Sequence, residues 1–135
     1  NMPALAGGQI VLPADFADIH NRGYGTHALL VGLGEESRIT NWVDPGARLE
    51  WMFQATEAGT YAVRALVKAD DSNSLTIQVG ENELISEVQP TGSEFAEVFL
   101  GEIDIAETGN QILSLRPVQE GWTGMELGTV TSIKQ

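Results

Sequence analysis

Short segments of alternating apolar and polar residues recur along this chain with turn-forming residues between them, and this pattern most constrains the fold. In residues 60–68, Tyr61 and Val63 fall on one face of an extended strand and Arg64 falls on the other. The pattern predicts an all-β fold, an antiparallel two-sheet β-sandwich of the jelly-roll type. Extended segments are expected at residues 9–12, 16–19, 47–54, 60–68, 75–79, 83–88, 95–105 (with a kink at Gly101), 111–118 and 125–133.

The length of 135 residues suits one domain with its own core. Residues 1–8 are interpreted as a linker or remnant ahead of the domain, and residues 9–135 as a single β-sandwich. No apolar run has the length of a membrane span, and no basic segment precedes an apolar stretch at the start. We expect a domain taken from a longer polypeptide.

The charge of the chain excludes two classes of partner. Its net charge of −12 repels phosphate backbones and anionic lipids, so neither nucleic acid nor a membrane is expected as a partner. Such a charge also keeps a secreted or salt-adapted domain soluble. We expect a monomer. The chain has no cysteine, which rules out disulfides, thiolate metal sites and cysteine catalysis.

Two tryptophans nine residues apart lie in contrasting surroundings. The alternation of residues 49–53 predicts that Trp51 is in the core. Trp42 precedes the turn sequence Asp-Pro-Gly at residues 44–46, so it is predicted at the mouth of a loop and not inside a sheet. Trp122 stands in a glycine-flanked loop. Leaving such a large apolar ring in water is costly, so we expect it to be covered by the apolar face of a sugar, by a partner surface or by the end of the sandwich.

The residues expected of a catalytic site are missing from the sequence. His20 and His27 could form a metal site with Asp18, but their spacing matches no strong ligand pattern. The serines show no nucleophile elbow, and no pair of carboxylates is marked for glycoside hydrolysis. We therefore predict that this domain is not an enzyme.

Several motifs resemble a known group of β-sandwich domains. Residues 10–20 fit the pattern I-x-L-x-A-x-x-A-x-I-H, which is similar to the opening of β-sandwich domains attached to bacterial fucosidases and sulfatases. Residues 41–51 stand where galactose-binding-like sandwiches, including carbohydrate-binding modules of families 6 and 35, have G-Y-I-D-x-G-D-W-V-E-Y. This resemblance implies a jelly-roll sandwich and a carbohydrate-binding site at its loop end.

The resemblance also implies individual site residues. The stacking aromatic of the family falls on Trp42, a second aromatic on Phe95, and a polar residue near the last strand on Glu126, where the family usually has Asn. Trp122 would supply an opposing wall. A structural calcium is implied as well, with Asp15 retained as a ligand, while Pro13 stands where a liganding Glu is expected.

Other candidates follow from their position in predicted loops. Tyr24, His20, Asn41 and Asp44 could bind sugar hydroxyls, although a loop tyrosine can anchor the chain and Asn and Asp are also common turn residues. Arg64 and Arg116 are expected within strands, where an arginine either contacts an acidic sugar or pairs with acidic neighbours.

We predict a non-catalytic carbohydrate-binding module that binds a polysaccharide or oligosaccharide beside the catalytic domain of a bacterial, secreted or periplasmic enzyme. Its site would consist of Trp42, Trp122, Tyr24, His20, Asn41, Asp44 and Glu126. The alternative is a structural accessory domain that buttresses a fucosidase-like or sulfatase-like catalytic domain and has no ligand of its own. Exposed loop tryptophans would favour the first hypothesis, and an apolar surface patch would favour the second.

Overall fold

The computed structural model describes residues 2–4 and 6–135, so positions 1 and 5 of the predicted linker lie outside the described residues. The described part consists of strands joined by loops and two short 3-10 helices, η1 (Ala14–Phe16) and η2 (Gly34–Glu36). It includes no helix that could cross a membrane. The strands are β1 (Gln9–Leu12), β2 (Asp18–His20), β3 (Leu29–Val31), β4 (Arg38–Trp42), β5 (Arg48–Ala55), β6 (Gly59–Lys68), β7 (Asn73–Val79), β8 (Asn82–Val88), β9 (Ala96–Ile105), β10 (Gly109–Pro117) and β11 (Met125–Lys134).

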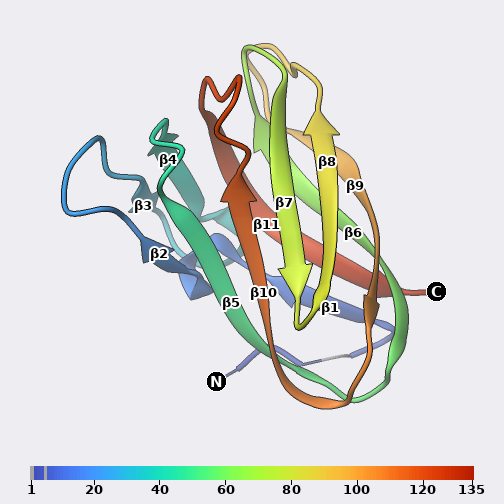
Figure 1. Cartoon of the computed structure of the whole chain (residues 1–135). Coiled ribbons are helices and arrows are strands. Elements are labelled where there is room, and N and C mark those ends of the chain that lie inside the picture. Colours follow the sequence, from blue (N-terminus) through green and yellow to red (C-terminus); the bar gives the residue numbers. More distant parts are fainter. Residues whose placement is uncertain (1, 5) are drawn as a thin grey trace.

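These strands form two antiparallel sheets that pack face to face (Figure 1). One sheet has the order β3-β4-β11-β6-β9, with β1 also paired to β11, and the other has the order β2-β5-β10-β7-β8. Trp51 and Tyr61 are fully buried between the sheets, as predicted, and Tyr61 donates a hydrogen bond of 2.6 Å from Oη to the carbonyl of Glu57. Burial raises the pKa of this tyrosine. The predicted all-β sandwich is confirmed.

The predicted kink at Gly101 is also confirmed. Gly101 is opposite Val63, but the next pair in the ladder is Arg64 with Phe99, so β9 carries an extra residue at this point. Its φ of +132° is a conformation that glycine adopts without the clash of a Cβ atom. The bulge lets the ten-residue strands β6 and β9 twist together around the core.

A second bulge, in β4, corrects the prediction for Trp42. Strict alternation from buried Ile39 would turn Trp42 outward. However, Ile39 is opposite Leu127 and Trp42 is opposite Met125, so three steps on β4 match two on β11. Asn41 takes up the extra residue with a φ of +58°, a value that Asn tolerates better than most residues. Trp42 therefore turns inward and ends a strand inside the sheet, so the prediction that it lies outside the sheet is wrong, and of the two alternatives for its ring the buried one holds.

Connections between strands alternate between the two ends of the sandwich. The loops β4–β5, β6–β7, β8–β9 and β10–β11 gather at one end, which is at the top of Figure 1. The chain ends lie away from these loops, because β1 runs antiparallel to the last part of β11, with Gln9 opposite Ile133. Before β1, Gln54 donates from its amide to the carbonyl of Pro3, which lays this segment against β5.

Candidate functional site

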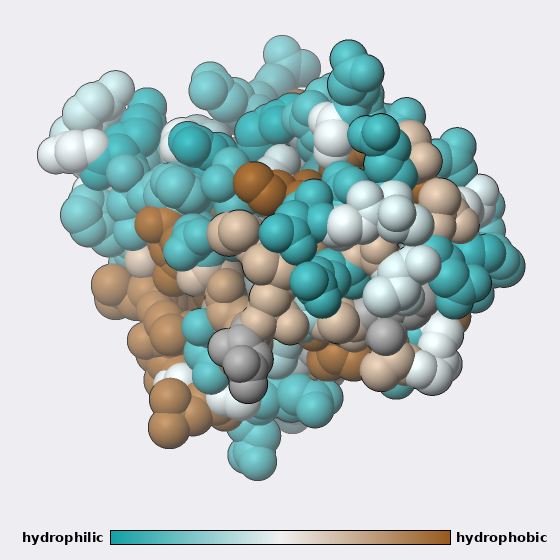
Figure 2. Space-filling model, turned by 90° about the horizontal axis from the view of Figure 1, so that it is seen from below, coloured by the Kyte–Doolittle hydropathy of each residue, from teal (hydrophilic) through white to brown (hydrophobic). Residues whose placement is uncertain are grey.

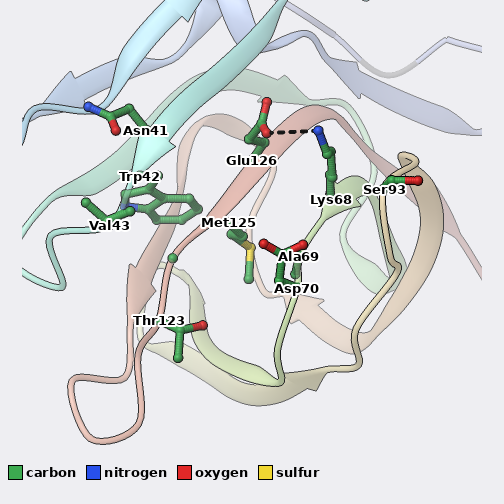
Figure 3. Close-up of a pocket in the computed structure, with 11 residues that line it drawn as sticks. Asn41, Trp42, Val43, Lys68, Ala69, Asp70, Ser93, Thr123, Met125 and Glu126 are labelled. Atoms are coloured by element: carbon green, nitrogen blue, oxygen red, sulfur yellow. Dashed lines mark ion pairs between the residues drawn. The ribbon is translucent and has the colours of Figure 1, made fainter.

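A cavity of about 450 Å³ opens where the four clustered loops meet (Figure 3). It lies between the end of β4, the end of β6 and the start of β11, so residues far apart in sequence share its wall. Its lining combines polar side chains with a few apolar ones: Asn41, Trp42, Val43, Lys68, Ala69, Asp70, Ser93, Thr123, Gly124, Met125 and Glu126.

The two candidate tryptophans form one packed pair beside this cavity. Trp42 has no exposed surface, and its Nε1 donates a 2.9 Å hydrogen bond to the carbonyl of Ala47. Trp122 packs edge-on against it, with ring centroids 5.1 Å apart and planes at 63°. Trp122 is itself partly buried and packed against the core, and it does not line the cavity. Trp42 therefore has no face open for stacking, and Trp122 is only partly exposed.

Asp44 is buried in an ion pair and is not free to bind a sugar, which corrects its assignment. Its carboxylate accepts hydrogen bonds from both Nε and Nη2 of Arg22 and from the amide of Gly46 at 2.9 Å. The hydrogen bond from Arg22 is the main cause that holds the pKa of Asp44 below its ordinary value, followed by that from Gly46. This pair ties the β2–β3 loop to the β4–β5 loop.

Two polar side chains fix the remaining loops around the cavity. Buried Asn73 accepts from the amide of Thr123 at 2.8 Å and donates to the carbonyl of Gly124 at 3.1 Å. Thr91 exchanges backbone and side-chain hydrogen bonds of 2.9 and 3.0 Å with Ala69. The loops that carry Asp70, Ser93 and Thr123 are therefore held in place without a ligand, which lowers the entropic cost of binding one.

The polar rim has hydrogen-bonding capacity that the protein itself does not use. Glu126, half-buried, lies 3.4 Å from Lys68 Nζ through one carboxylate oxygen. Exposed Asn41 donates from Nδ2 to the carbonyl of His27 at 3.1 Å and keeps its other groups free. Asp70 makes no side-chain hydrogen bond within the described part of the chain, and Figure 3 shows its carboxylate beside Met125 at the centre of the lining. One cation against two carboxylates leaves the cavity negative.

Two further predicted residues lie outside this cavity. His20 is on β2, with its Nε2 3.1 Å from Glu50 Oε1 on the five-stranded sheet. Tyr24 is 70% exposed on the β2–β3 loop, with the Arg22 guanidinium 4.7 Å from its ring centroid. Of the seven predicted sugar-binding residues, the cavity brings together Asn41, Trp42 and Glu126.

The surroundings of Asp15 give little support to a calcium ion. One carboxylate oxygen accepts from the amide of Gly34 at 2.7 Å, and the other is buried without a hydrogen-bond partner among the described residues. Within that same part of the chain, no three His, Asp or Glu side chains come together as metal ligands. Calcium prefers six to eight oxygen ligands, so Asp15 by itself does not make a site. Its role as a calcium ligand stays a prediction.

The sequence analysis missed four residues of the cavity lining: Lys68, Asp70, Ser93 and Thr123. Only their position in the sequence could have indicated them, because each lies at a strand end or in a loop at the same end of the sandwich. From β4 onward, consecutive strands run in opposite directions along the sandwich, so every second connection reaches the same end, and the proximity of these residues could be derived once the strand order was known.

Solved structures with the same fold include several that carry carbohydrate-binding modules. A family 35 carbohydrate-binding module from Clostridium thermocellum is similar with a TM-score of 0.73 and 17% identity, over 94% of this chain and 98% of that one. The CBM35 from Cellvibrio japonicus Abf62 has a TM-score of 0.65 and 16% identity, over 93% and 92%. At this identity the likeness shows the fold.

Longer proteins contain the same fold as one part. The Podospora anserina GH26-CBM35 β-(1,4)-mannanase matches with a TM-score of 0.69 and 16% identity, over 96% of this chain but 28% of the mannanase. No match was found among curated proteins. A family model described as a domain of unknown function, DUF5077, matches residues 32–134, which is most of the chain, and the chain therefore belongs to that family.

Proposed function

We propose that this domain is a non-catalytic carbohydrate-binding module whose site is the loop-end cavity. The observation that carries the proposal is the cavity itself, an open recess with polar side chains from several loops and spare hydrogen-bonding groups on Asn41, Asp70 and Glu126. The fold that the chain shares with family 35 modules supports the same conclusion. A recess with fixed loops and exposed polar groups suits the binding of a polyhydroxylated ligand.

The charges in the cavity favour a neutral glycan. Lys68 is already paired with Glu126, and Asp70 adds a further negative charge, so a uronic acid or sulfated sugar would meet net repulsion. Carboxylates are strong acceptors for sugar hydroxyls. Val43, which is 42% exposed at the rim, offers an apolar surface to sugar C–H groups. Without an open aromatic ring, we expect affinities in the millimolar to micromolar range, about −4 to −8 kcal/mol.

Such a module would act by raising the local concentration of the polysaccharide. Attached to a catalytic domain in a secreted or periplasmic bacterial enzyme, it would hold the polysaccharide near the active site and raise its effective concentration. The mannanase similar to this chain, in which the matched part is 28% of the length, illustrates the arrangement.

The test is calorimetric titration with neutral polysaccharides (galactomannan, xylan, β-glucan and galactan) and with polygalacturonate, each with and without calcium. We expect a neutral polysaccharide to bind. Asp70→Asn and Glu126→Gln should each weaken that binding about tenfold, the effect of losing one hydrogen bond to a charged group. Glu102→Gln is the matched control, since exposed Glu102 lies on β9 of the same sheet but outside the cavity. Failure of every glycan to bind the folded protein would refute the proposal.

A specific observation favours the second candidate, a structural accessory domain without a ligand. Trp42 is fully buried and Trp122 partly so, whereas consecutive apolar residues on β3 are exposed, with Leu30 at 44% and Val31 at 56%. A buttress would use that apolar strand and leave the cavity empty. The Asp70 and Glu126 variants separate the two candidates, because only a binding site responds to them.

A further inference from the structure

The loop-end cavity carries more negative than positive charge. The charged residues of its lining are Lys68, Asp70 and Glu126. Lys68 Nζ lies 3.4 Å from one carboxylate oxygen of Glu126, so the charges of these two residues cancel. The Asp70 side chain is exposed and forms no ion pair with any described residue. One negative charge therefore remains in the cavity, and a ligand with a positive charge would complement it.

The residues around the cavity do not supply that positive charge. Asp71 and Glu94, each next to a lining residue in the sequence, are acidic and exposed. Arg22 is already paired with Asp44. Arg38 donates to backbone carbonyls and does not line the cavity. Since the whole protein has a net charge of −12, its field also attracts cations to this end.

The side chain of Asn41 presents an acceptor to the cavity. Its Nδ2 donates a 3.1 Å hydrogen bond to the carbonyl of His27, which fixes the orientation of the amide. Figure 3 shows the nitrogen on the side away from the other lining residues and the oxygen nearer to them. The loop that carries His27 is closed by Asn21 and Ala28, which exchange hydrogen bonds of 3.1 and 2.8 Å. The oxygen of Asn41 is therefore held ready to accept.

The free hydrogen-bonding groups of the rim are mostly acceptors. They are the oxygen of Asn41, both oxygens of Asp70 and the second oxygen of Glu126. A sugar hydroxyl brings one donor to such a set. A protonated primary amine brings three N–H donors, no acceptor and a positive charge. The amine thus matches both the charge and the acceptors of this rim, and a sugar carries one wherever an amino group replaces a hydroxyl and is not acetylated.

We propose that the cavity prefers a glycan of unacetylated hexosamine, whose ammonium group pairs with Asp70, and this preference presupposes the glycan-binding function proposed above. The hydroxyls of the same sugar would bind Asn41 and Glu126, as those of a neutral glycan would. A hydrogen bond between ionised partners is roughly twice as strong as one between neutral groups, so the amine adds affinity that a hydroxyl cannot supply. The charge that repels an acidic glycan here attracts a cationic one.

The experiment is an NMR titration of the isotope-labelled protein with three short β-1,4-linked trimers that differ at carbon 2 of the sugar. They are the trimers of glucose, of N-acetylglucosamine and of glucosamine, with a hydroxyl, an acetamide and a free amine. The glucosamine trimer should bind about fivefold more tightly than the glucose trimer, which is the difference between a charged and a neutral hydrogen bond. Amide signals should shift at residues 68–70 and 123–126.

Two substitutions should move this preference in opposite directions. Asp70→Asn keeps the shape of the side chain but removes the charge, so the preference for the amine should fall to about one. Lys68→Gln removes the competing cation and leaves Glu126 unpaired, so the preference should rise, which a loss of structure would not produce. Glu102→Gln is the matched control, because it removes an exposed charge on β9 outside the cavity and should leave the preference unchanged.

Each other outcome would overturn the proposal. Equal binding of the glucose and glucosamine trimers would reject the preference and leave the proposed function intact. Failure of all three trimers and of the neutral polysaccharides to bind would reject both. Equal binding of trilysine, which has amines but no sugar ring, would mean a general attraction of cations.

The location of the shifted signals is a separate criterion. Figure 2 shows hydrophobic side chains gathered on the side of the molecule where β3 lies in Figure 1, and no residue of β3 lines the cavity. Leu29 and Val31 of β3 are 53% and 56% exposed. Shifts confined to that strand would mean apolar adhesion of the trimers and would reject the cavity as their site.

Discussion

At the loop end of the sandwich, buried residues and residues of the cavity rim use their polar groups for opposite purposes. Trp42, which lines the cavity, and Asp44, which lies outside it, have their polar groups occupied by Ala47, Arg22 and Gly46. At the rim, Asp70 and Glu126 keep acceptors that no described residue fills. Stability and binding are therefore separable here: changes at the buried residues should destabilise the protein, and changes at the rim should alter only what it binds.

The largest effect is expected from Trp42→Ala. Removing a fully buried indole leaves a cavity in the core and should lower the free energy of unfolding by about 3–5 kcal/mol. Trp42→Phe should cost less, because it fills most of the space and loses mainly the hydrogen bond to Ala47. Chemical denaturation measures both. A Trp42→Ala protein of normal stability that has lost glycan binding would place this ring in the binding site. It would contradict the division between buried residues that stabilise the fold and rim residues that bind.

Asn41 tests the bulge that turns Trp42 inward. Asn41→Val places a β-branched residue at a φ of +58° and should lower the free energy of unfolding by about 1–2 kcal/mol. Asn41→Gly removes the same hydrogen bond to His27 but suits this φ, so it should be clearly more stable than the valine variant. Equal stability of the two variants in urea denaturation would show that the bulge is not strained.

Acid titration tests the buried ion pair between Asp44 and Arg22. The folded-state pKa of Asp44 is below its ordinary value, so the stability that the pair contributes is present at neutral pH and is lost as pH falls through that lowered pKa. Asp44→Asn should therefore be less stable than the parent protein at neutral pH. This difference in stability should disappear as the pH falls below about 4. Thermal unfolding at a series of pH values measures the difference in unfolding temperature between the two proteins. A difference that stays constant with pH would show that the ion pair does not stabilise the fold.

The smallest stability effects are expected at the rim. Asp70→Asn and Glu126→Gln should change the free energy of unfolding by less than about 1 kcal/mol, since a partly exposed pair such as Lys68–Glu126 contributes little. Their effect should appear in calorimetric titration with the glycan. A large loss of stability in either variant would mean that the rim, too, is structural.

Most strands could be predicted from the sequence because their alternation is regular. The bounds of β5 to β11 differ from those predicted by two residues at most, and the bulge at Gly101 was marked by its glycine. By contrast, β3 and β4 were not predicted. β3 has three consecutive apolar residues and thus no alternation, and the bulge at Asn41 interrupts the alternation of β4.

The same bulge explains why the candidate site was only partly predicted. The sequence placed the site at the loop end of the sandwich, and the cavity that contains Asn41 and Glu126 lies at that end. Trp42 was assigned to the surface because a one-residue shift reverses which face a side chain occupies. Asp44 depends on Arg22, which is 22 positions away, so no local pattern indicates the pair.

The pairing of β1 with the end of β11 decides how the domain can be joined to others. Because Gln9 is opposite Ile133, the first strand begins beside the end of the last one, and β11 spans the sandwich from there to the cavity at Met125. First and last strands that meet in this way permit circular permutation or insertion of the sandwich, from β1 to β11, into a loop of another protein. In either arrangement the tether attaches roughly 30 Å from the cavity, the length of a ten-residue strand, so the cavity mouth stays free.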